Sequence, residues 1–199
     1  MLDEQPDDKT TNTELLRRVR LGNKHAFEVL IHRHQRSILN FIFRFMGNQA
    51  DAEDLNQEVF LRVWKSAGKY QPDAKFTTWL YKIATNLCIN KQRAIRIRRV
   101  FALSRYQEQR QDSKDTFITG AGVDLLSPEK RLIDSEQSVQ LLNALNALPT
   151  SQRLAIVLKI YDEMSYQEIA QIMDRTVAAV DSLLIRAKKN LRKKLIEEK

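Results

Sequence analysis

The sequence is poor in the residues that build disulfides, metal centres and nucleophilic sites. Among 199 residues it has one cysteine, Cys88, and three histidines, which lie together in one short stretch. A lone cysteine excludes an internal disulfide and a thiolate zinc cage. His32 and His34 are two positions apart, which places them on different faces of a helix, so we interpret them as structural residues rather than as a metal-binding pair.

Glycine and proline are also scarce, with five and four residues, and they fall where the apolar periods break. A strand-like alternation of apolar and polar residues is nearly absent as well. Together these observations predict an all-α protein.

Long apolar runs are missing, and the first residues are acidic (Asp3, Glu4, Asp7 and Asp8), which is the reverse of a signal peptide. We therefore expect a cytoplasmic protein with no direct membrane insertion. The net charge of +8 favours a polyanionic partner, with nucleic acid ahead of an anionic membrane surface.

The apolar periods predict two small helical domains joined by a flexible linker. In the first domain, residues 1–100, we expect helices from the Thr11–Glu14 capping-box pair to Gly22, from about Lys24 to Met46, from near Asp51 to before Gly68, and from about Thr77 to near Arg99. Residues 101–127 turn polar and aperiodic, which predicts the linker. A helix start at Ser127, Pro128 and Glu129 opens the second domain, residues 128–199.

The end of the second domain has the pattern of a helix-turn-helix. Ser165 and Glu168 form a capping box before a short helix, and Thr176 caps the next helix after a tight turn. That second helix has small residues at its start and basic residues later, which is typical of a helix that reads DNA in the major groove. The candidate DNA-binding residues are Thr176, Ala179, Ser182, Arg186 and Lys189. The lysines of the final turns could equally be a solvated cationic helix end that suits the helix dipole.

The first domain carries an acidic helix start, and its candidate docking residues are Asp51, Asp54, Gln57, Glu58, Leu61 and Trp64. A metal site is disfavoured, because acidic side chains are normal in the first turns of a helix and no second acidic cluster offers further ligands. The pattern instead favours docking on a basic protein surface.

The next helix of the first domain interleaves aromatic, basic and amide residues. Asn86, Asn90 and Arg93 are spaced four and three apart, so they share a face that can read the edges of unstacked bases. Trp79, Leu80 and Cys88 are expected in the core. Tyr70 and Lys75 flank Pro72 on a loop and complete the candidate strand-binding set, since Tyr70 is less easily explained as core.

Three ordered motifs resemble the extracytoplasmic-function (ECF) sigma factors of the sigma-70 family. In chain order they are DAEDLNQEVFLRVW, FTTWLYKIATNLCIN and LPTSQRLAIVLKIYDEMSYQEIAQIM. The resemblance implies that the acidic helix docks on the β′ clamp helices of core RNA polymerase. It also implies that Tyr70 and the Asn86 face hold a flipped base of the minus-ten element. The last helix would read the minus-thirty-five element as duplex, and its domain would meet the β flap. An anti-sigma factor is an implied partner, and the protein would be a monomer, free or on polymerase.

The recognition helix departs from the family pattern. Relatives often carry Gly-Thr-Val and a basic residue where this chain has Ala178-Ala179-Val180-Asp181, and a basic residue in place of Leu183. Asp181 would repel phosphates, so it either accepts from a cytosine amino group or faces away. Which residues of this helix read bases is therefore left open by the sequence.

Two other functions compete with promoter recognition. A stand-alone helix-turn-helix regulator would bind duplex by itself, usually as a dimer, but it leaves the acidic and aromatic-amide helices without a role. A nucleic-acid-processing enzyme lacks a catalytic set, because there is no His/Cys cluster, no phosphate-cradling glycine loop and no second carboxylate group. We therefore expect a non-enzymatic protein without metal or cofactor.

Overall fold

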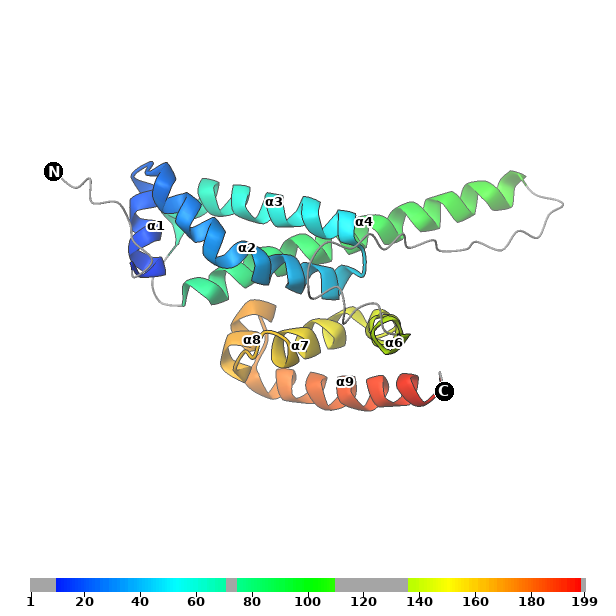
Figure 1. Cartoon of the computed structure of the whole chain (residues 1–199). Coiled ribbons are helices and arrows are strands. Elements are labelled where there is room, and N and C mark those ends of the chain that lie inside the picture. Colours follow the sequence, from blue (N-terminus) through cyan, green and yellow to red (C-terminus); the bar gives the residue numbers. More distant parts are fainter. Residues whose placement is uncertain (1–9, 71–74, 110–135, 198–199) are drawn as a thin grey trace.

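The computed structural model describes residues 10–70, 75–109 and 136–197, and the regular elements in these ranges are helical, as predicted (Figure 1). The amino-terminal set is α1 (Asn12–Arg20), α2 (Lys24–Met46), α3 (Gln49–Ser66), the short 3-10 turn η1 (Ala67–Lys69) and α4 (Phe76–Gln109). The carboxy-terminal set is α6 (Glu136–Asn146), α7 (Thr150–Ile160), α8 (Tyr166–Met173) and α9 (Val177–Glu197). Within the described ranges, no helix combines the length and apolar character needed to cross a bilayer.

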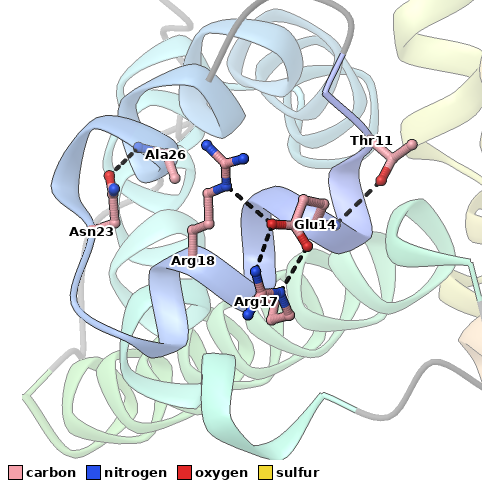
Figure 2. Close-up of polar contacts among 6 residues, drawn as sticks. All are labelled: Thr11, Glu14, Arg17, Arg18, Asn23 and Ala26. Carbon is pink, nitrogen blue, oxygen red and sulfur yellow. Dashed lines mark hydrogen bonds and ion pairs between the residues drawn. The ribbon is translucent and has the colours of Figure 1, made fainter. Parts of the chain in front are cut away.

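Side-chain caps set the first two helix starts (Figure 2). The Thr11 hydroxyl accepts from the Glu14 backbone N–H at 3.3 Å, and the Asn23 side chain accepts from the Ala26 N–H at 2.9 Å. The Glu14 carboxylate does not complete a capping box; it accepts from Arg17 at 2.7 Å and from Arg18 at 3.0 Å. These two guanidinium groups lower the pKa of Glu14 to about 2.

The predicted helix bounds are accurate for α2 and wrong for the end of α4. α2 spans Lys24–Met46 and ends at Gly47, whose φ of 70° is left-handed. α4 continues to Gln109, ten residues past the predicted end near Arg99. This stretch contains Ala, Leu, Arg, Gln and Glu with no glycine or proline, so helix propensity outweighs its lack of an apolar period. The remainder of the predicted linker and the start at Ser127 lie outside the described residues.

The core is formed by the apolar stripes that the sequence indicates. Ala52, Leu55, Val59 and Val63 on α3 are buried against α2 and α4, as are Leu80 and Cys88 on α4. On α9, Val180, Leu184 and Ala187 are buried against α6, α7 and α8. This stripe fixes which face of α9 points away from the protein.

The two sets of helices pack directly on each other, with α6 and α7 against α2 and α8 against α4. The buried Arg153 of α7 donates to the Phe45 carbonyl oxygen in the last turn of α2 at 2.8 Å. Beside it, a Cβ on Gly47 would lie 2.3 Å from the amide end of the Asn146 side chain, so that side chain would have to move; the positive φ of Gly47 is the stronger reason for glycine here.

Candidate nucleic-acid interface

α4 presents the amide face that the sequence predicts. Asn86, Asn90 and Arg93 are all exposed on this helix, while Leu80, Ala84 and Cys88 are buried on its other side. We call Asn86, Asn90 and Arg93 the strand-capture face. Because they stand on a rigid helix, their side chains are held at fixed spacing, as reading the edges of unstacked bases requires.

Tyr70 differs from the prediction, because its ring belongs to the core. It is only 8% exposed, and its ring packs edge-on against Trp79 and Phe76, with centroid distances of 5.3 and 6.4 Å. His34 joins this aromatic cluster at 5.3 Å from Phe76, and burial lowers its pKa. Tyr70 lies directly before residues 71–74, which are outside the described residues, and its role in base capture stays a prediction.

The side chains at the acidic start of α3 form two groups, one exposed and one paired within the protein. Asp54, Gln57, Leu61 and Trp64 are exposed at spacings of three and four, and we call them the docking face. The Trp64 ring packs 5.0 Å from Phe27 of α2, which fixes its orientation.

The other carboxylates of α3 are engaged by neighbours. Asp51 pairs with Lys91 of α4 at 2.7 Å, and Glu58 pairs with Arg62 at 2.9 Å. Among the residues that the structure describes, no three His, Cys, Asp or Glu side chains gather where they could hold a metal ion. The arrangement fits an anionic and apolar protein-docking surface.

α8 and α9 form the predicted helix-turn-helix. The Ser165 hydroxyl accepts from the Glu168 N–H at 3.2 Å, and the Glu168 carboxylate accepts from the Ser165 N–H at 2.9 Å, which completes the capping box. Asp174 turns the chain with a left-handed φ of 51°, which an aspartate tolerates. Thr176 then caps α9 by accepting from the Ala179 N–H at 3.2 Å.

The exposure of α9 shows which of its side chains a partner could reach. Thr176, Ser182, Arg186 and Lys189 are exposed, whereas Ala179 is half-buried. Leu183 is only 9% exposed and belongs to the core. Asp181 is exposed, and so is Ile185, at 61%. Ile185 lies four residues after Asp181 and off the buried stripe, so helical spacing alone places it on the exposed side of α9.

The helix-turn-helix packs against α4 on the side that carries Lys75, Lys82 and Asn86. Lys75 pairs with Glu168 of α8 at 2.9 Å, and Lys82 pairs with Asp174 at 2.5 Å. Hydrogen bonds from Lys75 and from Ser165 lower the pKa of Glu168 to about 2. A cleft between the two sets of helices is lined by Asn86 on one side and by Asp174 and Arg175 on the other. Sequence reasoning could not find these pairs, because about ninety residues separate the partners.

A second contact between the sets is partly buried. The Tyr81 hydroxyl of α4 donates to the Asp162 carboxylate at 2.8 Å, and the Arg44 guanidinium lies 4.5 Å from the centre of the Tyr161 ring. Burial raises the pKa of Asp162 to about 6, although the Tyr81 hydrogen bond and Arg44 both oppose the shift.

Comparison with known proteins agrees with this architecture. The model of the family described as Sigma-70 region 2 matches residues 30–99, and that of Sigma-70, region 4 matches residues 138–191. The RNA polymerase sigma-H factor of Pseudomonas aeruginosa is 32% identical over 185 residues, 92% of either chain. The ECF RNA polymerase sigma-E factor of Escherichia coli K12 is 30% identical over 196 residues, which cover 94% of this chain and 96% of the relative.

Solved structures share the fold. CnrH in complex with the cytosolic domain of CnrY has a TM-score of 0.68 at 22% identity, covering 94% of this chain and 99% of that chain. The sigma factor RpoE in complex with the anti-sigma factor NepR from Bartonella quintana has a TM-score of 0.59 at 18% identity, covering 87% and 98%.

These matches extend over both helical sets, so a stand-alone helix-turn-helix regulator does not describe the chain. Sigma factors are non-catalytic subunits of RNA polymerase, which agrees with the expectation of a protein that does no chemistry itself. The chain belongs to the ECF sigma factors of the sigma-70 family, which direct transcription initiation by RNA polymerase.

Proposed function

We propose how the parts of this sigma factor divide the work of initiation. Residues 1–100 dock on polymerase and hold the melted minus-ten strand, residues 128–199 read the minus-thirty-five duplex, and residues 101–127 connect them. The separation of exposed acidic, amide and basic faces on α3, α4 and α9 carries this proposal. Each face has the chemistry of a different partner.

The docking face on α3 binds the β′ clamp helices of core polymerase. Leu61 and Trp64 supply apolar surface that a partner can bury, and Asp54 supplies charge that complements a basic surface. Asp51 and Glu58 lie beside this face, and each is held by an intramolecular ion pair. Docking of the carboxy-terminal domain on the β flap belongs to the same proposal.

The strand-capture face on α4 holds unstacked bases of the minus-ten element. Extracting a base from the stack costs a few kcal/mol, and contacts to its exposed edges must offset that cost. Asn86 and Asn90 supply amide donors and acceptors, while Arg93 and Lys75 attract the backbone. Tyr70 contributes a ring at the edge of the same region. Melted DNA is then stabilised by binding alone, without ATP.

α9 reads the duplex minus-thirty-five element in the major groove through residues of its first four turns. Ser182 and the capping residue Thr176 are exposed at this end, and Arg186 and Lys189 follow one and two turns later. The basic residues contribute salt-dependent phosphate contacts that position the helix, while base contacts specify the sequence.

We further propose a cytoplasmic protein, monomeric when free or on polymerase, that is regulated by an anti-sigma factor. CnrH and RpoE were each solved in complex with a partner, the cytosolic domain of CnrY and the anti-sigma factor NepR respectively. The shared fold makes a partner of the same kind the simplest expectation for this chain.

Adding the full-length protein to core polymerase and sequencing the transcripts made from genomic DNA tests the proposal. We expect a stable complex and a set of start sites that share two promoter elements. Absence of binding to core polymerase would contradict the docking assignment.

The strand-capture face is tested in the same assay with Asn86→Ala. We expect weaker promoter opening, measured by permanganate reactivity of unpaired thymines, with binding to core polymerase unchanged. Asn143→Ala on the exposed side of α6 is the matched control. Unchanged opening and unchanged promoter choice in Asn86→Ala would show that the face does not hold the strand.

A further inference from the structure

The exposed side of the recognition helix has an unusual chemistry for a DNA-reading surface. Ala178, Asp181, Ser182 and Ile185 share one side of α9, because they are spaced three and four apart, and all four are exposed. We call them the reading face. These four positions supply an acceptor-only carboxylate, a hydroxyl and a large apolar side chain, and the exposed cations Arg186 and Lys189 follow one turn further along the same helix.

We propose that Asp181 and Ile185 set the base preference of this sigma factor, with the Asp181 carboxylate accepting from the amino group of a cytosine and Ile185 packing on a thymine methyl group. This inference rests on the proposed reading of the minus-thirty-five duplex by α9 and specifies the bases that it selects.

Burial fixes the orientation of the reading face. Val180, Leu184 and Ala187 are buried against the other carboxy-terminal helices, and Leu183 is buried beside them. α9 therefore cannot roll to present Leu183 without losing its packing. The side that remains available to a groove is the one that carries Asp181 and Ile185.

The chemistry of base edges then selects the partner of Asp181. An ionised carboxylate only accepts hydrogen bonds, so guanine N7 and O6 and thymine O4 would repel it. Adenine offers an amino group, but the neighbouring N7 is an acceptor that opposes the second carboxylate oxygen. Cytosine offers an amino group with no acceptor beside it in the major groove, so it is the favoured base.

Nearby cations can compensate for the negative charge of a carboxylate at this position. Arg175 precedes the helix, and Lys188 and Lys189 follow the reading face, all of them exposed. The Arg186 Nε donates to the Ser182 carbonyl oxygen of its own helix at 3.1 Å, so this guanidinium lies along α9. Phosphates on both sides of the groove can therefore be met by cations, which offsets their repulsion of Asp181.

Ile185 completes the pattern, since 61% of this branched apolar side chain is exposed. A thymine methyl is the apolar group that a major groove offers. Residues four apart on an α-helix are separated by about 6 Å along its axis, which is roughly two base-pair rises. We therefore expect the selected thymine about two base pairs from the selected cytosine.

A simpler role for Asp181 is structural, because an acidic residue in the first turns of a helix is favoured by the helix dipole. In that case its replacement would alter stability and leave base preference unchanged. The test must therefore read sequence preference and stability separately.

Polymerase holoenzyme assembled with the full-length protein is given a pool of promoters with a randomised minus-thirty-five duplex and a constant minus-ten element. For the wild type we expect enrichment of a cytosine and, about two base pairs away, a thymine. Asp181→Asn should change the preferred cytosine to adenine, because an asparagine amide pairs with adenine N6 and N7. Ile185→Ala should lower the thymine preference about tenfold.

Glu28→Gln is the matched control, because it makes the same carboxylate-to-amide change at an exposed position of α2, away from the reading face. An unchanged preference in Asp181→Asn, with or without a change in melting temperature, would overturn the inference. So would a wild-type preference lacking either base. If no variant and no wild-type protein showed any duplex preference, while opening at the minus-ten element persisted, the proposed reading by α9 would itself be wrong.

Discussion

Arg153 is a charged side chain that is only 7% exposed, and it connects three helices. One of its terminal nitrogens donates to the Phe45 carbonyl oxygen at 2.8 Å and to the Asn146 side-chain oxygen at 2.6 Å. Its guanidinium carbon also lies 5.2 Å from the centre of the Phe45 ring. Burial lowers its pKa, because the cation has lost hydration that these contacts must replace.

We predict that Arg153→Met lowers the free energy of unfolding by about 2 kcal/mol. Methionine keeps an apolar stem of similar length, but it leaves the Phe45 carbonyl at the end of α2 and the Asn146 oxygen without their donor. Urea denaturation followed by circular dichroism measures the loss. Arg192→Met, at an exposed position on α9, should change stability by less than about 0.5 kcal/mol. Equal effects of the two substitutions would show that the contact at Phe45 contributes nothing.

Residues with a local signature were predictable, and residues that depend on distant partners were not. Helical spacing predicted the buried Leu80 and Cys88 of α4 and the buried Val180, Leu184 and Ala187 of α9. The later apolar residues at the same spacing on α9, Leu191 and Leu195, are only half-buried, and so is Trp79, which was expected in the core. Tyr70 was misjudged because its burial comes from rings of α4. Nothing near Arg153 in the sequence indicates that it meets Phe45, which is 108 positions away.

At the scale of single elements, α8 shows how a short helix is held in place. It has 8 residues, and a helix of this length is marginal by itself in water. Its stability comes from the Ser165–Glu168 capping box and from the buried Ile169 and Ile172. Glu168 takes part in two contacts: one of its carboxylate oxygens accepts from the Ser165 N–H, and the other accepts from Lys75 at the start of α4. The cap that starts α8 therefore also ties the helix-turn-helix to the amino-terminal set.

We predict that Ser165→Ala lowers the free energy of unfolding by about 1 kcal/mol. The substitution removes the acceptor for the Glu168 N–H and the hydroxyl that donates to the Glu168 carboxylate at 2.7 Å. Thermal unfolding reports the change. Ser37→Ala, at an exposed position inside α2, is the control and should be neutral or slightly stabilising, since alanine favours a helix interior. A loss at Ser37 as large as at Ser165 would argue against the cap.

Element ends were predictable where a cap or a glycine marks them. α2 has both, Asn23 at its start and Gly47 at its end, and its bounds are as predicted. α3 begins at Gln49, because Asn48 accepts from the Asp51 N–H at 2.8 Å, and this cap was not used in the prediction. α4 extends past its predicted end for a different reason. The polar composition of this stretch indicated a linker, whereas the helix propensities of its individual residues favour a helix.

At the scale of the whole molecule, the packed arrangement engages Lys75, which is proposed to bind DNA, and Lys82, a second cation on the same side of α4. Lys75 and Lys82 are paired with Glu168 and Asp174 of the helix-turn-helix. Phosphates of a captured strand would compete for the same two cations. Strand capture by α4 and the packing of α8 on it therefore oppose each other, and the balance between them depends on what stabilises the contact between the helical sets.

Asp162 is one group whose protonation bears on that contact. Its carboxylate meets the Tyr81 hydroxyl of α4 and lies near Tyr161 and Arg44, and Glu163 lines the same hollow. Burial raises its pKa from 3.8 to about 6 in the packed state. In a state where the helical sets are apart, the carboxyl is in water and recovers its ordinary pKa. The packed state therefore binds this proton more tightly than the separated state.

The sign of the pH dependence follows from that difference. The contribution of Asp162 to packing is fully present below pH 3.8 and is lost as the pH rises through about 6. A difference of about two pKa units corresponds to at most about 3 kcal/mol. Asp162→Asn keeps an oxygen that accepts from Tyr81 and removes the buried charge. We predict that it stabilises the protein at pH 7.5 and that the gap to the wild type closes towards pH 4.

Thermal unfolding at a series of pH values, with the radius of gyration from small-angle scattering, measures both effects. Comparing the variant with the wild type at each pH removes the contribution of every other titrating group. Asp54→Asn on the exposed docking face is the control and should show no such pH-dependent gap. A constant difference between Asp162→Asn and the wild type, or a variant that is less stable at pH 7.5, would show that this carboxyl does not control packing. A closing gap with a larger radius at high pH would show that deprotonation of Asp162 loosens the contact between α4 and the helix-turn-helix, and so favours release of Lys75 and Lys82 for DNA.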